Sequence, residues 1–213
     1  YFTGTVYSQG TAGNDYLLSS GSVRDIMTAG DGNDLLVGLG GNDSLDGGAG
    51  DDNMYGSAGN DTLRGGTGDD SLRGDDGADI YIFNKGDGND TIYNEQSLPA
   101  SDKLVLGEGF VTADIKLIRE ADDLLITFNN SVGDSVRIVD HYNGQELKTL
   151  RFSDSTAISL SLANTANTIY TYGDITDNVI EGYAGKDVLI GDDGNDTLSG
   201  LAGNDALLGN DGM

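Results

Sequence analysis

The sequence predicts an all-β chain whose main part is a parallel β-roll, a β-solenoid built from nine-residue repeats. The first observation is the period: in residues 38–82 each unit, such as GSAGNDTLR, has glycine first and fourth, Asp sixth and an apolar residue eighth. The second is the composition, since the 213 residues include 34 glycines, one proline and no cysteine. The third is a net charge of -25. Disordered acidic segments share such a charge, but they do not place an apolar residue at every ninth position.

The first region, residues 1–93, is the main block of repeats. Regular units run through it from GTAGNDYLL to KGDGNDTIY, with a slip of two residues after Ile82. One unit, SGSVRDIMT, is degenerate because Val23 stands where the fourth-position glycine belongs. Asp25 in that unit is therefore a weaker candidate for a site than the other sixth-position Asp residues.

The second region, residues 94–162, has no ninefold period. Six short apolar runs, separated by turn-forming residues, read LVL, IKLI, LLITF, VRIV, LKTLRF and AISL. They predict five or six strands in a short antiparallel meander, with no long helix. An open parallel coil leaves unpaired backbone groups at its end, so we expect this region to cap the roll. Tyr81, Phe83 and Tyr93 are placed to cover the last rung.

The third region, residues 163–213, begins a second roll. It opens with a polar transition and a weak unit in which Asn178 replaces the sixth-position Asp. Full units follow as GYAGKDVLI, GDDGNDTLS and GLAGNDALL. The chain starts without Met and ends part-way through a unit, so we expect it to be a piece of a longer protein.

The repeat also predicts two ladders of carboxylates. Glycine permits the positive φ values of tight loops, and positions seven to nine form a short strand whose eighth side chain points inward. Two units then make one coil of eighteen residues, and loops on the same edge stack at about 4.8 Å. One ladder places Asp52 between Asp34 and Asp70, and the other places Asp61 between Asp43 and Asp79.

These ladders require a cation. Carboxylates about 5 Å apart repel by roughly 3 kcal/mol at an effective dielectric constant of about 20. Burial of one leucine-sized side chain per unit returns only about 1.5–3 kcal/mol. Oxygen ligands favour Ca²⁺, whereas zinc and copper favour ligands that a chain with no Cys and one His lacks. Mg²⁺ demands a tighter octahedron than carbonyl-rich loops supply. The sequence therefore predicts several Ca²⁺ ions and folding that depends on them.

The nonapeptides resemble the repeats-in-toxin (RTX) family, also called haemolysin-type calcium-binding repeats. The resemblance covers residues 10–93 and 182–212, and GADIYIFNKGDGNDTIYNE with DKLVLGEGF is similar to the segment that flanks such blocks in RTX cytotoxins and large RTX exoproteins. It implies a module of a secreted toxin or exoprotein with a role in virulence. It also implies export by the type I secretion machinery of Gram-negative bacteria, disorder without calcium, and folding in extracellular calcium.

Carried over residue by residue, the resemblance implies a set of metal ligands. The side-chain ligands would be Asp15, Asp34, Asp43, Asp52, Asp61, Asp70, Asp79, Asp90, Asp187, Asp196 and Asp205. Backbone carbonyl ligands would come from positions two and four of one loop and positions one and three of the next loop on the same edge. They would be Gly30, Gly32, Gly47, Ala49, Gly41, Gly56, Ala58, Gly48, Gly50, Gly65, Thr67, Gly59, Gly74, Asp76, Gly66, Gly68, Asp87, Gly185, Gly200 and Ala202.

An enzyme is the first alternative function. The one histidine, His141, lies in VDHYNG and is interpreted as a surface or turn residue rather than a catalytic base. Ser153-Asp154 and Asp122-Asp123 are interpreted as turns rather than catalytic pairs. No nucleophile elbow, zinc-binding helix or phosphate-binding loop accompanies them in the sequence. We therefore predict that this chain is not an enzyme.

An adhesin, or a module that binds a host-surface ligand, is the second alternative. A flat binding face would need a regular outward array, but the third position is irregular. It runs Ala49, Ala58, Thr67 and Asp76. The sequence leaves this alternative open and favours the calcium-dependent module. The charge argues against nucleic acid, whose phosphates it would repel, and no apolar run has the length of a membrane span.

Overall fold

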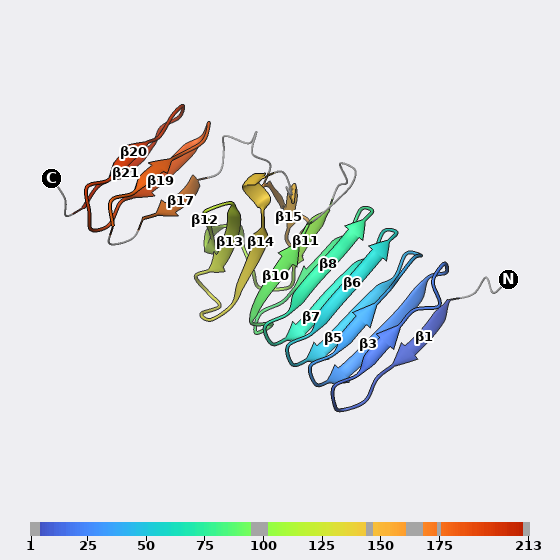
Figure 1. The fold of residues 1–213 in the computed structure, drawn as a ribbon. Coiled ribbons are helices and arrows are strands. Elements are labelled where there is room, and N and C mark those ends of the chain that lie inside the picture. The colour runs from blue at the N-terminus through green and yellow to red at the C-terminus, as the bar shows by residue number, and fades with distance from the viewer. Residues whose placement is uncertain (1–4, 95–101, 144–146, 161–167, 174–175, 211–213) are drawn as a thin grey trace.

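The structure, a computed structural model, describes residues 5–94, 102–143, 147–160, 168–173 and 176–210. Apart from two short 3-10 helices, η1 (Thr112–Asp114) and η2 (His141–Asn143), the regular elements are all strands, so the all-β prediction is confirmed. Within these ranges no helix has the length and apolar character needed to cross a membrane. The strands stack along one long axis from the N-terminal to the C-terminal end (Figure 1).

The main block is a parallel roll of two sheets that the chain visits alternately. The first sheet contains β1 (Val6–Gln9), β3 (Asp25–Asp31), β5 (Ser44–Ala49), β7 (Thr62–Thr67) and β9 (Ile80–Phe83). The second contains β2 (Tyr16–Leu18), β4 (Leu35–Val37), β6 (Asn53–Ala58), β8 (Ser71–Asp76) and β10 (Asn89–Tyr93). Leu45 pairs with Leu63 and Met54 with Leu72, so two nonapeptides make one coil as predicted. The solenoid has about 10 turns in all.

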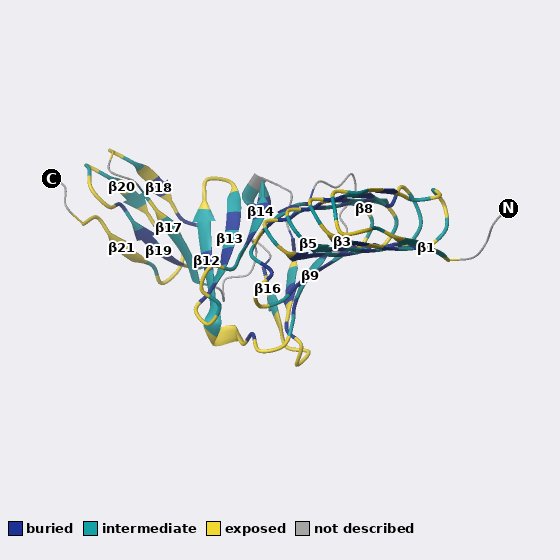
Figure 2. Cartoon of the chain, turned by 90° about the horizontal axis from the view of Figure 1, so that it is seen from below, coloured by how far each residue is buried: buried dark blue, intermediate teal, exposed yellow. Residues whose placement is uncertain are grey.

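Apolar side chains at the eighth position fill the space between the two sheets. Leu36, Leu45, Met54, Leu63 and Leu72 are each at most 2% exposed. In Figure 2, where the chain is seen from below, buried residues lie along the strands of the two layers, and exposed residues lie mainly on the loops. The inward direction of the eighth side chain is thus confirmed, and each nonapeptide adds one such side chain to a continuous core.

The strands are longer than the sequence predicts. β5 to β8 each span six residues, from position seven of one unit to position three of the next. The ladder continues because glycines early in the next unit also pair, as Gly48 does with Gly66. The same positions pair in the second sheet, where Ser57 pairs with Asp75, so the ladder runs through positions two and three whether or not glycine stands there.

The region after the roll contains all six predicted strands. They are β11 (Lys103–Leu106), β12 (Ile115–Glu120), β13 (Asp123–Phe128), β14 (Ser135–Val139), β15 (Thr149–Arg151) and β16 (Ala157–Ser159). β12, β13 and β14 form the expected antiparallel meander, and β15 pairs antiparallel with β16. A single antiparallel meander of all six is wrong, because β11 and β14 pair in parallel with β9 and β10, and β15 pairs in parallel with β11. The open edges of the roll supplied backbone partners that the sequence pattern does not show.

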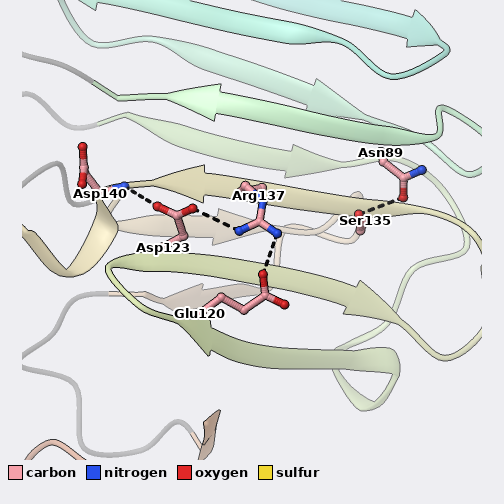
Figure 3. A network of polar contacts seen from close by, with 6 residues as sticks. All are labelled: Asn89, Glu120, Asp123, Ser135, Arg137 and Asp140. Carbon is pink, nitrogen blue, oxygen red and sulfur yellow. Dashed lines mark hydrogen bonds and ion pairs between the residues drawn. The ribbon is translucent and has the colours of Figure 1, made fainter. Parts of the chain in front are cut away.

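Polar contacts fasten the meander to itself and to the roll (Figure 3). Arg137 on β14 places its guanidinium 2.6 Å from Glu120 Oε2 and 3.0 Å from Asp123 Oδ2. The backbone N–H of Asp140 donates to Asp123 Oδ1 at 2.9 Å. The Ser135 hydroxyl donates to Asn89 Oδ1 at 2.9 Å, which joins β14 to β10. Arg137 therefore bridges the three antiparallel strands on one face.

An aromatic cluster closes the core at this end of the roll. Phe83 on β9 stacks on Phe128 of β13, with ring centroids 5.4 Å apart, and Phe110 lies 4.5 Å from Phe128. Tyr81 and Phe83 are each 1% exposed, so they cover the last rung as expected. Tyr93 instead lies on the outer face, where the Arg73 guanidinium sits 4.9 Å from its ring centroid.

The second block is joined to the meander by strand pairing. β17 (Thr168–Tyr172) pairs in parallel with β12, and β19 (Lys186–Ile190) and β21 (Ala206–Leu208) extend the same sheet. β18 (Val179–Glu181) and β20 (Thr197–Ser199) form the opposite, two-stranded layer. One eleven-stranded sheet thus runs from β2 through the meander to β21. The boundary expected between residues 162 and 163 lies outside the described residues.

Replacing Phe128 by Ala should destabilise the folded chain by about 3–5 kcal/mol, because the lost ring leaves a cavity between the roll and the meander. Urea unfolding in saturating calcium measures this free energy. Val132→Ala is the matched control: Val132 is 97% exposed, so its loss should cost within about 0.5 kcal/mol. Equal, small effects for both variants would show that the roll and the meander do not share a core.

Candidate metal centre

Sixth-position Asp residues form two ladders along the edges of the roll. In each ladder the backbone N–H of one Asp donates to Oδ1 of the Asp one rung further on. The distance is 2.8 Å from Asp34 to Asp52 and also from Asp52 to Asp70. The order expected from the period is therefore present. One ladder contains Asp15, Asp34, Asp52, Asp70 and Asp90, and the other contains Asp25, Asp43, Asp61, Asp79 and Asp102.

In most of the sixth-position Asp residues the second carboxylate oxygen is buried and accepts no hydrogen bond, whereas Oδ2 of Asp15 accepts the N–H of Thr11 at 2.6 Å. The buried oxygens without a hydrogen bond are Oδ2 of Asp34, Asp43, Asp52, Asp61, Asp70, Asp79, Asp90 and Asp196. A buried anionic oxygen without a donor is costly to keep in a folded chain. The repetition of the same orphaned oxygen at rung after rung fits a cation at each of these places.

The pKa values of the ladder carboxyls also show that burial disfavours their charged form. Burial raises the pKa of Asp52 and Asp61 to about 6, of Asp70 to about 7 and of Asp90 to about 9. Neighbouring ladder carboxylates add to the rise, and the backbone hydrogen bond opposes it. A folded-state pKa above the unfolded value means that the folded chain binds the proton more tightly. The ionised ladder therefore opposes folding progressively above pH about 4, and fully above the raised pKa values.

Backbone oxygens converge on the orphaned carboxylate oxygens. A Cβ built on Gly47, at position one, would lie 2.1 Å from Asp52 Oδ2 and 2.6 Å from the carbonyl oxygen of Gly65 in the next rung. At the equivalent place on the other edge, Gly56 would meet Asp61 Oδ2 at 2.5 Å and the Gly74 carbonyl at 2.9 Å. The cradle is therefore lined by oxygens, and a side chain at position one would fill it.

Carbonyls of positions two and four point from one rung to the next. A Cβ on Gly59 would lie 1.5 Å from the Gly41 oxygen, and one on Gly66 would lie 1.9 Å from the Gly48 oxygen. Both residues have positive φ, 143° and 110° respectively, so only glycine fits there without strain. At the two-residue slip the position-two contact is lost, since a Cβ on Gly86 meets nothing within 4 Å, but position four keeps it, since a Cβ on Gly88 would lie 2.1 Å from the Gly68 oxygen.

Carbonyls of position three already accept one hydrogen bond each. The oxygen of Thr67 accepts the N–H of Gly50, and the oxygen of Asp87 accepts that of Gly68, both at 2.8 Å. The oxygens of Ala49, Ala58, Asp76 and Ala202 accept equivalent bonds. Since a carbonyl has two lone pairs, one remains for another partner.

Side chains alone do not form a metal site. In the described ranges, no group of three or more His, Asp or Glu side chains is arranged to hold an ion. The ladders bring carboxylates together in pairs, so any bound ion must complete its shell with backbone oxygens. That all-oxygen set of carboxylates and carbonyls suits Ca²⁺, which takes six to eight oxygen ligands in flexible geometry.

Sequence reasoning missed Asp102 and doubted Asp25, yet both stand in a ladder. Asp25 is buried, and its N–H donates to Asp43 Oδ1 at 2.7 Å. The Ser19 hydroxyl occupies its Oδ2. Asp102 accepts the N–H of Asp79 at 2.7 Å although it follows no nonapeptide loop. The signal available for it was DKLV, which repeats positions six to nine of the unit without the glycines.

The two ladders end differently. Asp90 pairs with Val136 of β14, so no carboxylate follows it. Lys103 pairs with Thr149, and this register places Lys148 at the next position after Asp102. Burial raises the pKa of Asp102 to about 6, and the charges of Lys103 and Lys148 oppose that rise. A basic residue thus stands where the second ladder would continue.

The second block repeats the same geometry with gaps. Asp187 is buried, and its N–H donates to Asp205 Oδ1 at 3.0 Å. Asn178 keeps the ladder bond, since its N–H donates to Asp196 Oδ1 at 2.9 Å. Asp196 and Asp205 are only half-buried. This block therefore offers a shorter set of carboxylates than the first.

His141 is placed differently from the sequence-based interpretation. It lies in the turn η2, as expected, but it is 1% exposed and not at the surface. Its Nε2 lies 3.1 Å from the carbonyl oxygen of Leu160. The ring packs edge-on against Tyr142, with centroids 5.0 Å apart. Its described contacts therefore place it in the core of the flanking region, away from both ladders.

Four segments of the chain match the family of RTX calcium-binding nonapeptide repeats: residues 19–54, 28–63, 55–92 and 172–212, together more than half of the sequence. No curated protein matches the sequence. Six chains of solved structures match. One is the extracellular lipase LipA from Serratia marcescens, at 20% identity and a TM-score of 0.30, over 66% of this chain and 38% of the lipase chain. The chain thus spans well under half the length of that protein.

Asp61→Asn is expected to act in opposite directions with and without calcium. Asn keeps an oxygen for the N–H of Asp43 but removes a buried charge. The calcium concentration at the folding midpoint should rise about tenfold or more, because a charged ligand is lost. In chelator the β content should stay equal or increase. Circular dichroism in the far ultraviolet measures both. Asp154→Asn, in an exposed turn, is the matched control, and a fall in β content in chelator for Asp61→Asn would indicate a structural role instead.

Proposed function

The chain belongs to the family of RTX calcium-binding nonapeptide repeats, and from this premise we propose that it is a calcium-triggered folding module. Without Ca²⁺ the chain is disordered, and it folds when the ion binds outside the cell. The observation that carries the proposal is the repeated Oδ2 oxygen, buried and without a donor, along both ladders. A fold that buries uncompensated anions at every rung needs a counter-ion for each.

Each ion would sit between successive loops on one edge of the roll. For the loops around Asp52 and Asp70, the proposed ligands are those two carboxylates and the carbonyls of Gly48, Gly50, Gly65 and Thr67. Bound calcium supplies positive charge and draws these oxygens together. The protein's part is to present oxygens without obstructing side chains, which is why glycine stands at positions one and four.

The proposal includes secretion of a larger protein. Calcium is scarce in the cytosol and abundant outside the cell, so a chain that needs it stays unfolded until it has left. An unfolded chain fits a narrow type I export channel of a Gram-negative bacterium, and folding after exit favours movement in one direction. The chain would thus serve the export and folding of a parent toxin or exoprotein, and no catalytic step is assigned to it.

The flanking region, residues 94–162, is proposed to cap the first roll. Two contacts support this: β11 and β14 complete the open edges of β9 and β10, and Phe128 stacks on Phe83. A closed end removes the entropy cost of fraying from the last rung and lets calcium binding there be retained. The destabilisation expected for Phe128→Ala is the measurable consequence.

Calcium, and not magnesium, should convert the chain from a disordered to a β-rich state. In chelator the far-ultraviolet circular dichroism should be that of an unfolded chain, and millimolar CaCl₂ should produce a β spectrum. MgCl₂ at the same concentration and ionic strength is the control and should leave the chain unfolded, because Mg²⁺ demands a tighter octahedral shell. The same β content in chelator and in calcium would overturn the proposal.

A further inference from the structure

On each edge of the roll an outer ladder, formed by the Asn and Asp side chains at position five, runs beside the ladder of position-six carboxylates. In each case Oδ1 accepts the backbone N–H of position five in the next rung. On one edge Asn33 bonds Asn14, Asp51 bonds Asn33, Asp69 bonds Asp51 and Asn89 bonds Asp69, all at 3.0–3.1 Å. On the other edge Asn60 bonds Asn42 at 3.0 Å and Ala78 bonds Asn60 at 2.8 Å. These side chains are exposed, whereas the position-six carboxylates beside them are buried.

On each edge, the hydrogen bonds of the outer ladder at position five and of the carboxylate ladder at position six run in opposite directions along the roll. Asp69 donates its N–H back to Oδ1 of Asp51, while Asp52 donates its N–H forward to Oδ1 of Asp70. Successive loops are therefore joined by a reciprocal pair of side-chain to backbone bonds, one from each loop. The second block repeats the pair, with Asn195 donating to Asp177 and Asn178 donating to Asp196. The outer bond uses no orphaned oxygen, so it can form whether or not a cation is present.

Asn and Asp form the same outer bond but differ in charge. On the edge of Asp52 and Asp70, position five holds two consecutive carboxylates, Asp51 and Asp69. On the edge of Asp61, positions 42, 60 and 78 hold Asn, Asn and Ala, which carry no charge. The two edges of the roll thus share a backbone geometry and differ in the charge at position five, while Asp75, at position two, is the nearby carboxylate that acts on Asp61 and Asp79.

A charge count shows what the extra carboxylates do. We take one ion between each pair of successive loops. Each ion then touches two ladder carboxylates, and each carboxylate is shared by two ions. An ion of charge +2 is therefore matched by only one negative charge from the ladder. A filled ladder is then positively charged, and an empty one is negatively charged. A carboxylate at position five stabilises the filled ladder and destabilises the empty one.

We propose that position five sets how strongly each rung depends on calcium. Asn or Asp joins successive loops through a hydrogen bond to Oδ1, and Asp in addition increases the free-energy difference between the calcium-free and the calcium-bound roll. This inference rests on the proposed function and deepens it. Position five is a positioning and tuning site, and position six carries the ligand.

The test uses the full chain and two charge-exchange variants, each of which keeps an oxygen at position five. D51N/D69N removes two charges from one edge, and N42D/N60D adds two to the other. Calcium titrations and measurements in chelator are followed by far-ultraviolet circular dichroism, at low and high ionic strength. D51N/D69N should raise the calcium midpoint about two- to fivefold and increase the β content in chelator. N42D/N60D should change both quantities in the opposite direction.

High salt should reduce both shifts, because exposed charges are screened. Asn60→Ala, which removes the acceptor for the N–H of Ala78, should raise the midpoint at every ionic strength. Unshifted midpoints in both charge-exchange variants would overturn the tuning role while the proposed function stands. A shift of a hundredfold or more in D51N/D69N would also overturn it, by making Asp51 and Asp69 ligands. An unmodified chain that does not respond to calcium would overturn both proposals.

Discussion

The structure depends on one constraint: the rungs from Asp34 to Asp90 each bury an Asp carboxylate of which only one oxygen is hydrogen-bonded. Oδ1 holds the register between rungs, and Oδ2 is left buried without a donor. The eighth-position leucines supply the apolar core, but they cannot neutralise a column of anions. Glycine at position one follows from the same constraint, because the cradle around Oδ2 has no room for a Cβ, and glycine at position four follows from the close approach of the carbonyl in the preceding rung.

Much of this could be predicted from the sequence, because the period is local. The ninefold repeat fixes the alternation of inward and outward side chains, and Leu63 and Asp61 lie where the period puts them. Asp102 was missed because its rung keeps positions six to nine but not the glycine loop. His141 was misplaced because a single polar residue carries no period, and its burial depends on contacts with residues distant in sequence. The parallel pairing of β14 with β10 could not be predicted for the same reason, since an apolar run predicts a strand but not the strand with which it pairs.

The three regions share backbone pairing. The meander completes the roll on one side through β14 and receives β17 of the second block on the other side through β12. Lys116 and Arg119 of β12 reinforce that junction, each lying over the rings of two tyrosines. A stretch of sheet without nonapeptide repeats thus lies between the two repeat blocks, and it gives each of them an ordered edge on which to pair.

Amide hydrogen exchange over residues 34–92, measured by mass spectrometry in chelator and in saturating calcium, tests the central claim most directly. The amides that pair one rung with the next are protected only while the roll is folded. In this account the roll is folded only when its carboxylate ladders are neutralised. The account predicts exchange at unfolded-chain rates in chelator and strong protection across the whole stretch in calcium. Equal protection in both conditions would contradict it, because the roll would then stand with its carboxylates uncompensated.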